Sequence, residues 1–209
     1  MGKQKKGVVT NISNKELIGE NPKNIEIETR LCLDNPDVLI KWLKESAGLL
    51  KVSDQSDYYF DPPHKSFILI DPQGLKDADE WLRIRLGSDG DSVCYKKWHR
   101  EEKTGISLYA EEIEIPVTDG EQLLGIFEKM SFRRTSVIKK HRESWQYDDF
   151  IFDCDDVEEL GHFVEIEYKG RIEDPRKERE RIFDLLKKIG IKGWKIIDRG
   201  YPWMQWNKK

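Results

Sequence analysis

Charged and aliphatic residues alternate along several segments of this chain. Between Ile25 and Leu33 the charged positions are Glu26, Glu28 and Arg30, and most residues between them are aliphatic. Because successive side chains of a β-strand point to opposite faces, this pattern predicts a strand with one charged face and one apolar face. The same alternation recurs in residues 82–86, 112–115, 153–155 and 164–167. Its recurrence predicts a sheet whose charged faces turn toward one another around a polar channel.

Helices are predicted where apolar residues recur every three or four positions. Asn35-Pro36 favours a helix start with proline at the first helical position, and Gly48 favours the end of that helix. Asp119 can cap a second helix, and a third is predicted over residues 177–189. The remaining predicted strands span residues 54–61, 81–86, 92–98, 107–117, 137–147, 150–154 and 162–168. Residues 194–206 are rich in aromatic side chains, and a last strand is one interpretation of them. Together these elements predict an α+β fold.

The composition narrows the classes of partner. Charged residues make up 36% of the 209 residues, apolar residues make up 37%, and the formal net charge is -4. The low apolar fraction fits an interior lined with charge, and the near balance of charge argues against nucleic acid or an anionic membrane as a partner. The length suits one substantial domain, which we expect over residues 23–209 after a polar, lysine-rich tail at residues 1–22.

Several common classes of protein lose support. Three scattered cysteines predict neither a disulfide framework nor a cysteine-based zinc site. No apolar run approaches the roughly 20 residues of a membrane span, and the N-terminal segment lacks the apolar core of a secretory signal. We therefore expect a cytoplasmic location. The sequence also lacks a glycine-rich phosphate loop and a dinucleotide-binding fingerprint, which disfavours the standard mononucleotide folds.

Two kinds of charged residue share the predicted inward faces. The cationic ones are Arg83, Arg85, Lys96, Lys140 and Arg142. Guanidinium groups match phosphate geometry, so these residues on converging strands would neutralise most of the charge of a triphosphate. The acidic ones are Glu26, Glu28, Glu112, Glu114, Asp153, Asp155, Glu165 and Glu167. Crowded carboxylates repel one another, so a closed arrangement predicts bound divalent cations, whereas isolated strands would only have ordinary solvated faces.

Taken in order, these motifs form a recognisable series. The segments are Glu26-Ile27-Glu28-Thr29-Arg30, Asp57-Tyr58-Tyr59-Phe60, Leu82-Arg83-Ile84-Arg85, Tyr95-Lys96, Glu112 with Glu114, Lys140 with Arg142, and an Asp-x-Val-x-x-Leu-Gly-x-Phe-x-Glu-x-Glu run from Asp155 to Glu167. The series resembles the CYTH superfamily, named for class IV adenylyl cyclases and thiamine triphosphatases. The resemblance covers about residues 24–201, and the last run is its most specific part.

Two positions depart from the pattern of the superfamily, and at a third the register of the strand is uncertain. Arg30 stands where lysine is usual, and Ala110 stands where an arginine often precedes the glutamate pair. A shift of one residue in the strand that carries the basic pair would replace Lys140 by Lys139, because such a shift exchanges the two faces.

The resemblance implies an eight-stranded antiparallel β-tunnel, closed like a barrel, with a charged interior and helices packed outside. It implies catalytic roles for Glu26, Glu28, Lys96 and Glu165. Phosphate contacts are expected from Arg30, Arg83, Arg85, Lys96, Lys140 and Arg142. Mg²⁺ or Mn²⁺ is expected as the cofactor, bound by Glu26, Glu28, Glu112, Glu114, Asp153, Asp155, Glu165 and Glu167. The expected partner is a small-molecule triphosphate such as ATP, tripolyphosphate or thiamine triphosphate, and a homodimer is common among similar proteins.

Three functions are compatible with this reading. The first is metal-dependent cyclisation of ATP to cyclic AMP and pyrophosphate, as in class IV adenylyl cyclases. The second is hydrolysis of inorganic tripolyphosphate, thiamine triphosphate or a nucleoside triphosphate, because a shared phosphate site does not identify the reacting phosphorus. The third is a non-catalytic module that binds polyphosphate. The sequence leaves the choice between cyclase and triphosphatase close to even.

Overall fold

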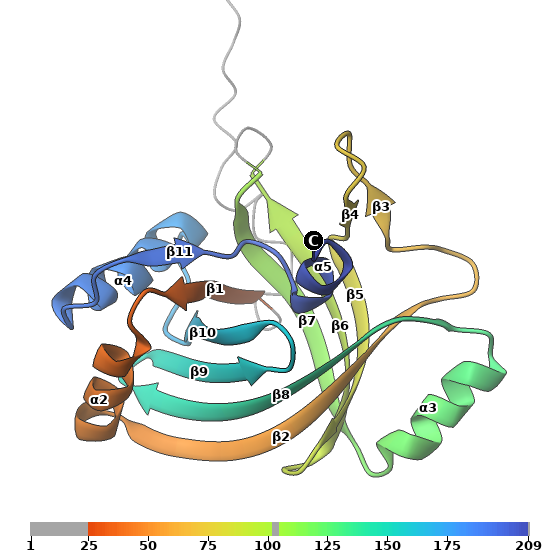
Figure 1. Cartoon of the computed structure of the whole chain (residues 1–209), viewed down its shortest axis with the longest axis horizontal. Coiled ribbons are helices and arrows are strands. Elements are labelled where there is room, and N and C mark those ends of the chain that lie inside the picture. Colours follow the sequence, from red (N-terminus) through yellow and green to blue (C-terminus); the bar gives the residue numbers. More distant parts are fainter. Residues whose placement is uncertain (1–24, 102–104, 209) are drawn as a thin grey trace, which may run out of the picture.

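The main chain forms a closed barrel (Figure 1). The computed structural model describes residues 25–101 and 105–208, so the predicted tail at residues 1–22 lies outside the described residues. Eight antiparallel strands follow the order β10-β9-β8-β2-β5-β6-β7-β1, and pairing of β1 with β10 closes the circle. Their bounds are β1 Ile25–Leu33, β2 Gly48–Asp61, β5 Glu80–Gly87, β6 Asp91–Arg100, β7 Ser107–Val117, β8 Arg133–Tyr147, β9 Phe150–Val157 and β10 Gly161–Tyr168. The predicted eight-stranded tunnel of the α+β class is confirmed.

Smaller elements are attached to this barrel. A short strand, β11 (Trp194–Ile196), pairs with β1, and β3 (Leu69–Ile70) pairs with β4 (Lys76–Asp77) in a separate hairpin. The helices are α2 (Pro36–Ser46), α3 (Gly120–Lys129), α4 (Pro175–Lys188) and α5 (Tyr201–Trp206). The side chains of Asn35, Asp119 and Asp174 accept hydrogen bonds from backbone N–H groups in the first turns of α2, α3 and α4. These caps explain where the three helices begin.

Three helices cover the outside of the barrel. Leu39 and Leu43 of α2 and Ile182 and Leu186 of α4 are fully buried in one apolar cluster with outward-facing residues of β1, β8, β9 and β10. Leu124 of α3 packs with outward-facing residues of β2 and β5 in a second cluster. Figure 1 shows α2 and α4 near one end of the curved sheet and α3 near the other. The apolar face of each strand is therefore used for the outer core, which leaves the charged face for the interior.

The fourth helix, α5, lies differently. Its residues contact inward-facing side chains: the ring of Tyr201 packs on Phe163 of β10, and Trp206 stacks on Trp81 of β5. These residues belong to a third apolar cluster, which also contains Tyr59 and Ile138. The expectation that helices pack outside the barrel thus holds for α2, α3 and α4, whereas α5 covers the interior at one end.

Several element boundaries differ from the prediction. The strand expected from residue 54 begins at Gly48, because β2 pairs with β8 along its whole length. The same pairing extends β8 back to Arg133. The C-terminal aromatic region contains a strand only at Trp194–Ile196 and then forms α5, whose first turn contains Pro202. None of the helices within the described residues has the length and apolar character that crossing a bilayer requires.

The outer core makes a simple prediction. Leu39 is fully buried, whereas its neighbour Val38 in the same helix is 42% exposed. Leu39→Ala should lower the free energy of unfolding by about 2–5 kcal/mol, because it removes buried methyl groups and leaves a cavity. Val38→Ala should change it by about 0.5 kcal/mol or less. Urea unfolding measures both values, and equal losses would contradict the assignment of α2 to the core.

Candidate active site

A cavity of about 250 Å³ lies inside the barrel, and all eight strands contribute to its wall. Alternation explains how: Glu165 and Glu167 face inward on β10, and Val164 and Ile166 between them belong to the outer core. Eight cationic and eight carboxylate side chains line the cavity. The cations are Arg30, Lys51, Arg83, Arg85, Lys96, Lys140, Arg142 and Lys169, and the carboxylates are Glu26, Glu28, Asp57, Glu112, Glu114, Asp153, Glu165 and Glu167. The wall therefore carries equal numbers of basic and acidic side chains.

The first group of carboxylates surrounds Lys96. Its ammonium nitrogen lies 2.9 Å from Glu26, 3.1 Å from Glu28 and 2.8 Å from Glu112. Burial, together with the neighbouring glutamates, raises the pKa of Glu26 to about 8 despite Lys96. Burial also raises the pKa of Glu112, but Lys96 and Arg83 outweigh it and hold the pKa of Glu112 at about 2. Burial raises the pKa of Glu167 as well, so one cation does not satisfy all of the carboxylates gathered here.

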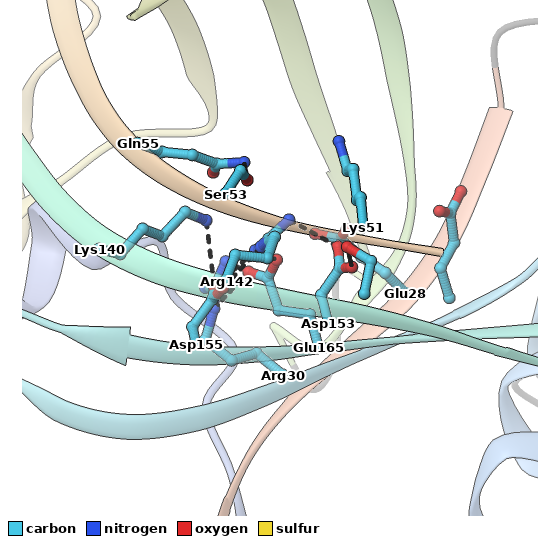
Figure 2. A network of polar contacts seen from close by, with 12 residues as sticks. Glu28, Arg30, Lys51, Ser53, Gln55, Lys140, Arg142, Asp153, Asp155 and Glu165 are labelled. Atoms are coloured by element: carbon cyan, nitrogen blue, oxygen red, sulfur yellow. Dashed lines mark hydrogen bonds and ion pairs between the residues drawn. The ribbon is translucent and has the colours of Figure 1, made fainter. Parts of the chain in front are cut away.

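The second group is centred on Arg142 and is shown in Figure 2. Arg142 donates two hydrogen bonds of 2.5 Å to Asp155 and one of 2.6 Å to Asp153, and it also pairs with Glu165. Lys140 lies 3.1 Å from Asp155, and the Tyr201 hydroxyl donates to the same carboxylate at 2.7 Å. Arg142 and Lys140 outweigh the effect of burial and lower the pKa of Asp155. Asp155 therefore holds these cations in place.

Arg30 and Lys140 complete this second group. Arg30 pairs with Glu165, and its guanidinium lies 4.2 Å from the centre of the Tyr201 ring. Burial opposes the ionised form of Glu165, yet Arg30 and Arg142 hold its pKa well below the ordinary value. Burial and the nearby Arg142 lower the pKa of Lys140 to about 8. Lys140 is thus an amine whose neutral form is accessible near neutral pH.

The third group joins β2 and β5. Arg85 donates two hydrogen bonds to Asp57, of 2.6 Å and 2.8 Å, and Arg83 donates one of 2.9 Å to Glu114. Burial favours the neutral form of Asp57, but Arg85 and Arg83 hold its pKa well below the ordinary value. The buried Nε of Arg83 has no acceptor among the described residues. An anion in the cavity would supply one.

The structure places the sequence-predicted residues as follows. All six residues predicted to contact phosphate line the cavity. Seven of the eight residues predicted as metal ligands also line it, while Asp155 lies behind Lys140 and Arg142 with its side chain fully buried. The side chain of Lys140 is 2% exposed and lies in the interior, whereas Lys139 is exposed. The open question of register in β8 is settled in favour of Lys140.

Several residues of the site were not predicted. Asp57 and Tyr59 alternate on the inner face of β2, where the pairing of β2 with β5 places them opposite Arg85 and Arg83. Tyr201 comes from α5, which lies far along the chain from the strands it contacts. Lys51 and Lys169 line the cavity from the ends of β2 and β10, and no motif marks them.

Divalent cations are a chemical match for part of this wall. Carboxylate oxygens are the ligands that Mg²⁺ and Mn²⁺ prefer, and burial raises the pKa of Glu26 and of Glu167 although Lys96 and Lys169 lie beside them. As the described side chains stand, no three acidic, histidine or cysteine groups converge in the geometry that an ion requires. The ammonium of Lys96 lies between Glu26, Glu28 and Glu112. Binding of an ion by these residues would need Lys96 to move aside.

Comparison with known proteins gives one family. The family model of the CYTH domain matches residues 24–201. A relative from Methanocaldococcus jannaschii, "Putative adenylate cyclase MJ0240", is 32% identical over 179 residues, which cover 85% of this chain and 96% of the relative.

Solved structures show the same fold. The PH1819 protein from Pyrococcus horikoshii OT3 superposes with a TM-score of 0.70 at 24% identity, covering 88% of this chain and 99% of that one. A Hippeastrum protein, described as "Putative adenylyl cyclase HpAC1" with a dominant triphosphatase activity, superposes with a TM-score of 0.59 at 20% identity. The match covers 84% of this chain and 92% of that one. At these identities the likeness concerns the fold.

The pKa of Glu26 predicts a pH dependence of stability in the absence of metal. Because its pKa is raised from the ordinary 4.5 to about 8, the folded protein binds more protons than the unfolded chain between these pH values. The free energy of unfolding should therefore fall as pH rises from about 4.5 to about 8, with a slope of up to about 1.4 kcal/mol per pH unit from this group. The low pKa of Glu112 acts in a separate window, at and below 4.5.

Glu26→Gln should remove the part of this fall that comes from Glu26 when unfolding is followed in urea with chelator at pH 5 and pH 8, and the raised pKa of Glu167 should leave a smaller fall. Glu121→Gln, a substitution on an exposed first turn of α3, is the matched control and should leave the slope unchanged. An unchanged slope in Glu26→Gln would show that Glu26 is ionised across the whole range.

The ionised form of Asp155, unlike that of Glu26, should stabilise the folded protein. Asp155→Asn should lower the free energy of unfolding by about 3–5 kcal/mol, because Arg142 and Lys140 would stay buried with less negative charge beside them. The neighbouring Asp156, whose side chain is 62% exposed, provides the control. Asp156→Asn should be close to neutral in the same urea titration. A small loss in Asp155→Asn would mean that Glu165 and Asp153 suffice to hold Arg142.

Proposed function

The chain belongs to the CYTH domain family, and from this premise we propose that it is a metal-dependent enzyme that breaks a phosphoanhydride bond of a bound triphosphate. One observation supports this most directly: equal numbers of cations and carboxylates line a single cavity. A triphosphate alone would leave that wall with an uncompensated negative charge. A triphosphate together with divalent cations would restore the balance, because the cations neutralise the phosphates and the carboxylates together.

Different residues of the cavity would bind the phosphates and the metal. Arg83, Arg85, Lys140 and Arg142 would bind phosphate oxygens, and Arg83 already has one N–H without an acceptor. Asp57 and Asp155 would keep these cations oriented, since both carboxylates are buried beneath them. Guanidinium groups held in this way need little reorganisation as charge develops on the phosphates.

Carboxylates of the first group would hold the metal. We assign this role to Glu26, Glu28, Glu112 and Glu167, with Asp153, Glu114 and Glu165 as further cavity carboxylates. A divalent ion bound there would polarise a phosphoryl oxygen and stabilise the leaving oxygen. Lys96 would be released from the three carboxylates that it now contacts, and its ammonium would be free to bind the phosphate chain. We propose Glu26, Glu28 and Lys96 as catalytic for these reasons, and Glu165 as a fourth catalytic residue because it lines the same cavity beside Arg30 and Arg142.

Cyclisation is the first reaction to consider, because the Methanocaldococcus relative named as an adenylate cyclase is similar over nearly its whole length. The 3'-hydroxyl of ATP would attack the α-phosphorus, and pyrophosphate would leave. Hydrolysis is the second candidate, because the same phosphate-binding residues and metal ligands would serve when water is the nucleophile. The triphosphatase activity named for the Hippeastrum protein adds to the case for testing hydrolysis.

The products decide between these reactions. We expect the purified protein, incubated with Mg²⁺ or Mn²⁺ and ATP, to release cyclic AMP with pyrophosphate in a chromatographic assay. Orthophosphate without cyclic AMP, from ATP or from tripolyphosphate, would establish hydrolysis in its place. Chelator should abolish turnover in both cases.

Two variants test whether turnover comes from this cavity. Arg83→Ala should lower kcat/KM about 10²–10³-fold, by analogy with the loss of one transition-state donor. Arg133→Ala, at an exposed arginine at the start of β8, is the matched control and should keep full activity. Metal-independent binding of tripolyphosphate with no product from any triphosphate would overturn the proposal and favour a binding module.

A further inference from the structure

The last helix, α5, is fixed to β8 by hydrogen bonds from its side chains. The indole N–H of Trp206 donates one of 3.1 Å to the backbone oxygen of Thr135, and the side-chain amide of Gln205 donates one of 3.1 Å to that of Val137. The first residue of the helix, Tyr201, is thereby held at one end of the cavity. It forms part of the cavity wall and is only 2% exposed.

The ring of Tyr201 contacts two cations of the group centred on Arg142. The guanidinium of Arg30 lies 4.2 Å from the ring centre, and the ammonium of Lys140 lies 5.3 Å from it. The attraction between a cation and the face of an aromatic ring is strongest where water is excluded, as it is here. Phe163 packs on the same ring with the two centroids 5.3 Å apart, which holds the Tyr201 ring in place.

The hydroxyl of Tyr201 reaches the carboxylate that holds Lys140. It donates to Oδ2 of Asp155 at 2.7 Å, and the Lys140 ammonium donates to the same oxygen at 3.1 Å (Figure 2). Arg142 donates a third hydrogen bond to this oxygen. A carboxylate oxygen offers about two lone-pair sites, so three donors compete for it. The hydroxyl therefore weakens the hold of Asp155 on Lys140.

Arg30 differs from Lys140, because its guanidinium is engaged through all three nitrogens. Two of them pair with Glu165, and the third donates a hydrogen bond of 2.5 Å to the backbone oxygen of Arg199, just before α5. A planar guanidinium can stack on a ring and form these hydrogen bonds at once, whereas the lysine that is usual here could not. Arg30 thus fixes the ring of Tyr201, and Lys140 is the cation beside this ring that is suited to bind a ligand.

We propose that Tyr201 is a positioning residue, whose ring and hydroxyl hold the Lys140 ammonium toward the cavity, where it contacts a phosphate oxygen of the bound triphosphate. The inference rests on the proposed function and adds to it a residue from outside the eight strands. Asp155 alone would draw Lys140 into a buried ion pair. The ring attracts the same ammonium without neutralising it, because the ring carries no net charge.

A double-mutant cycle between Tyr201 and Lys140 tests this role, with kcat/KM measured for the triphosphate that the wild-type protein turns over fastest. Tyr201→Leu should lower kcat/KM about tenfold or more, as expected for the loss of a buried cation–π contact. In the Lys140→Met background the same substitution should lower it by less than about twofold, because the group that Tyr201 positions is absent. Equal losses in the two backgrounds would show a merely structural role and overturn the inference.

Two further variants separate the ring from the helix that carries it. Tyr201→Phe keeps the ring beside Arg30 and Lys140, so it should retain clearly more activity than Tyr201→Leu, and an equal loss would overturn the role of the ring. Trp203→Leu is the matched control, because Trp203 lies in the same helix but outside the cavity wall. It should change kcat/KM by less than about twofold. Urea unfolding checks that each variant is folded in the assay.

The failure of the proposed function would look different. If the wild-type protein turns over no triphosphate, isothermal titration of tripolyphosphate with Mg²⁺ measures the same coupling as a ratio of Kd values across the four proteins of the cycle. A loss of affinity in Tyr201→Leu that disappears in the Lys140→Met background would then support the role of Tyr201 although catalysis is absent. Additive losses, or a wild-type protein that binds no tripolyphosphate, would overturn this role as well.

Discussion

Pairing of buried charge is the interaction on which the rest of this structure depends. Moving ions out of water is costly, and a barrel that turns eight carboxylates and eight cations inward is stable only when each ion has partners of opposite charge. The three groups meet this condition through single residues at their centres. Lys96 joins three carboxylates, Arg142 joins another three, and Asp57 joins two arginines. The outer apolar core shapes the barrel, but these ion pairs determine what its interior can bind.

The carboxylates of the three groups are neutralised by nearby cations to different degrees. This difference distinguishes the carboxylates that stabilise the fold from those suited to binding a ligand. Asp155 and Glu165 beside Arg142, and Asp57 beside Arg85, have a lowered pKa, so their ionised forms stabilise the folded protein. Around Lys96 the pKa of Glu26 is raised, so its ionised form is a cost that persists in the folded protein. Local conflicts of this kind are typical of functional sites, because they are relieved when the ligand binds. The carboxylates next to Lys96 are therefore the part of the wall best suited to a cation.

The sequence predicted the parts of this site that depend on local patterns, and it did not predict the parts that depend on contacts between distant segments. Alternation along a strand is local, so it identified Glu26, Glu165 and Arg83 as inward-facing without knowledge of the fold. The choice between Lys139 and Lys140 depends on pairing between strands, because a shift of one residue would exchange their faces. Tyr201 could not be predicted at all, since its role requires α5 to reach inward-facing residues of β8 and β10. For the aromatic region at residues 194–206 the sequence offered a last strand as one interpretation, whereas the structure has a three-residue strand followed by α5.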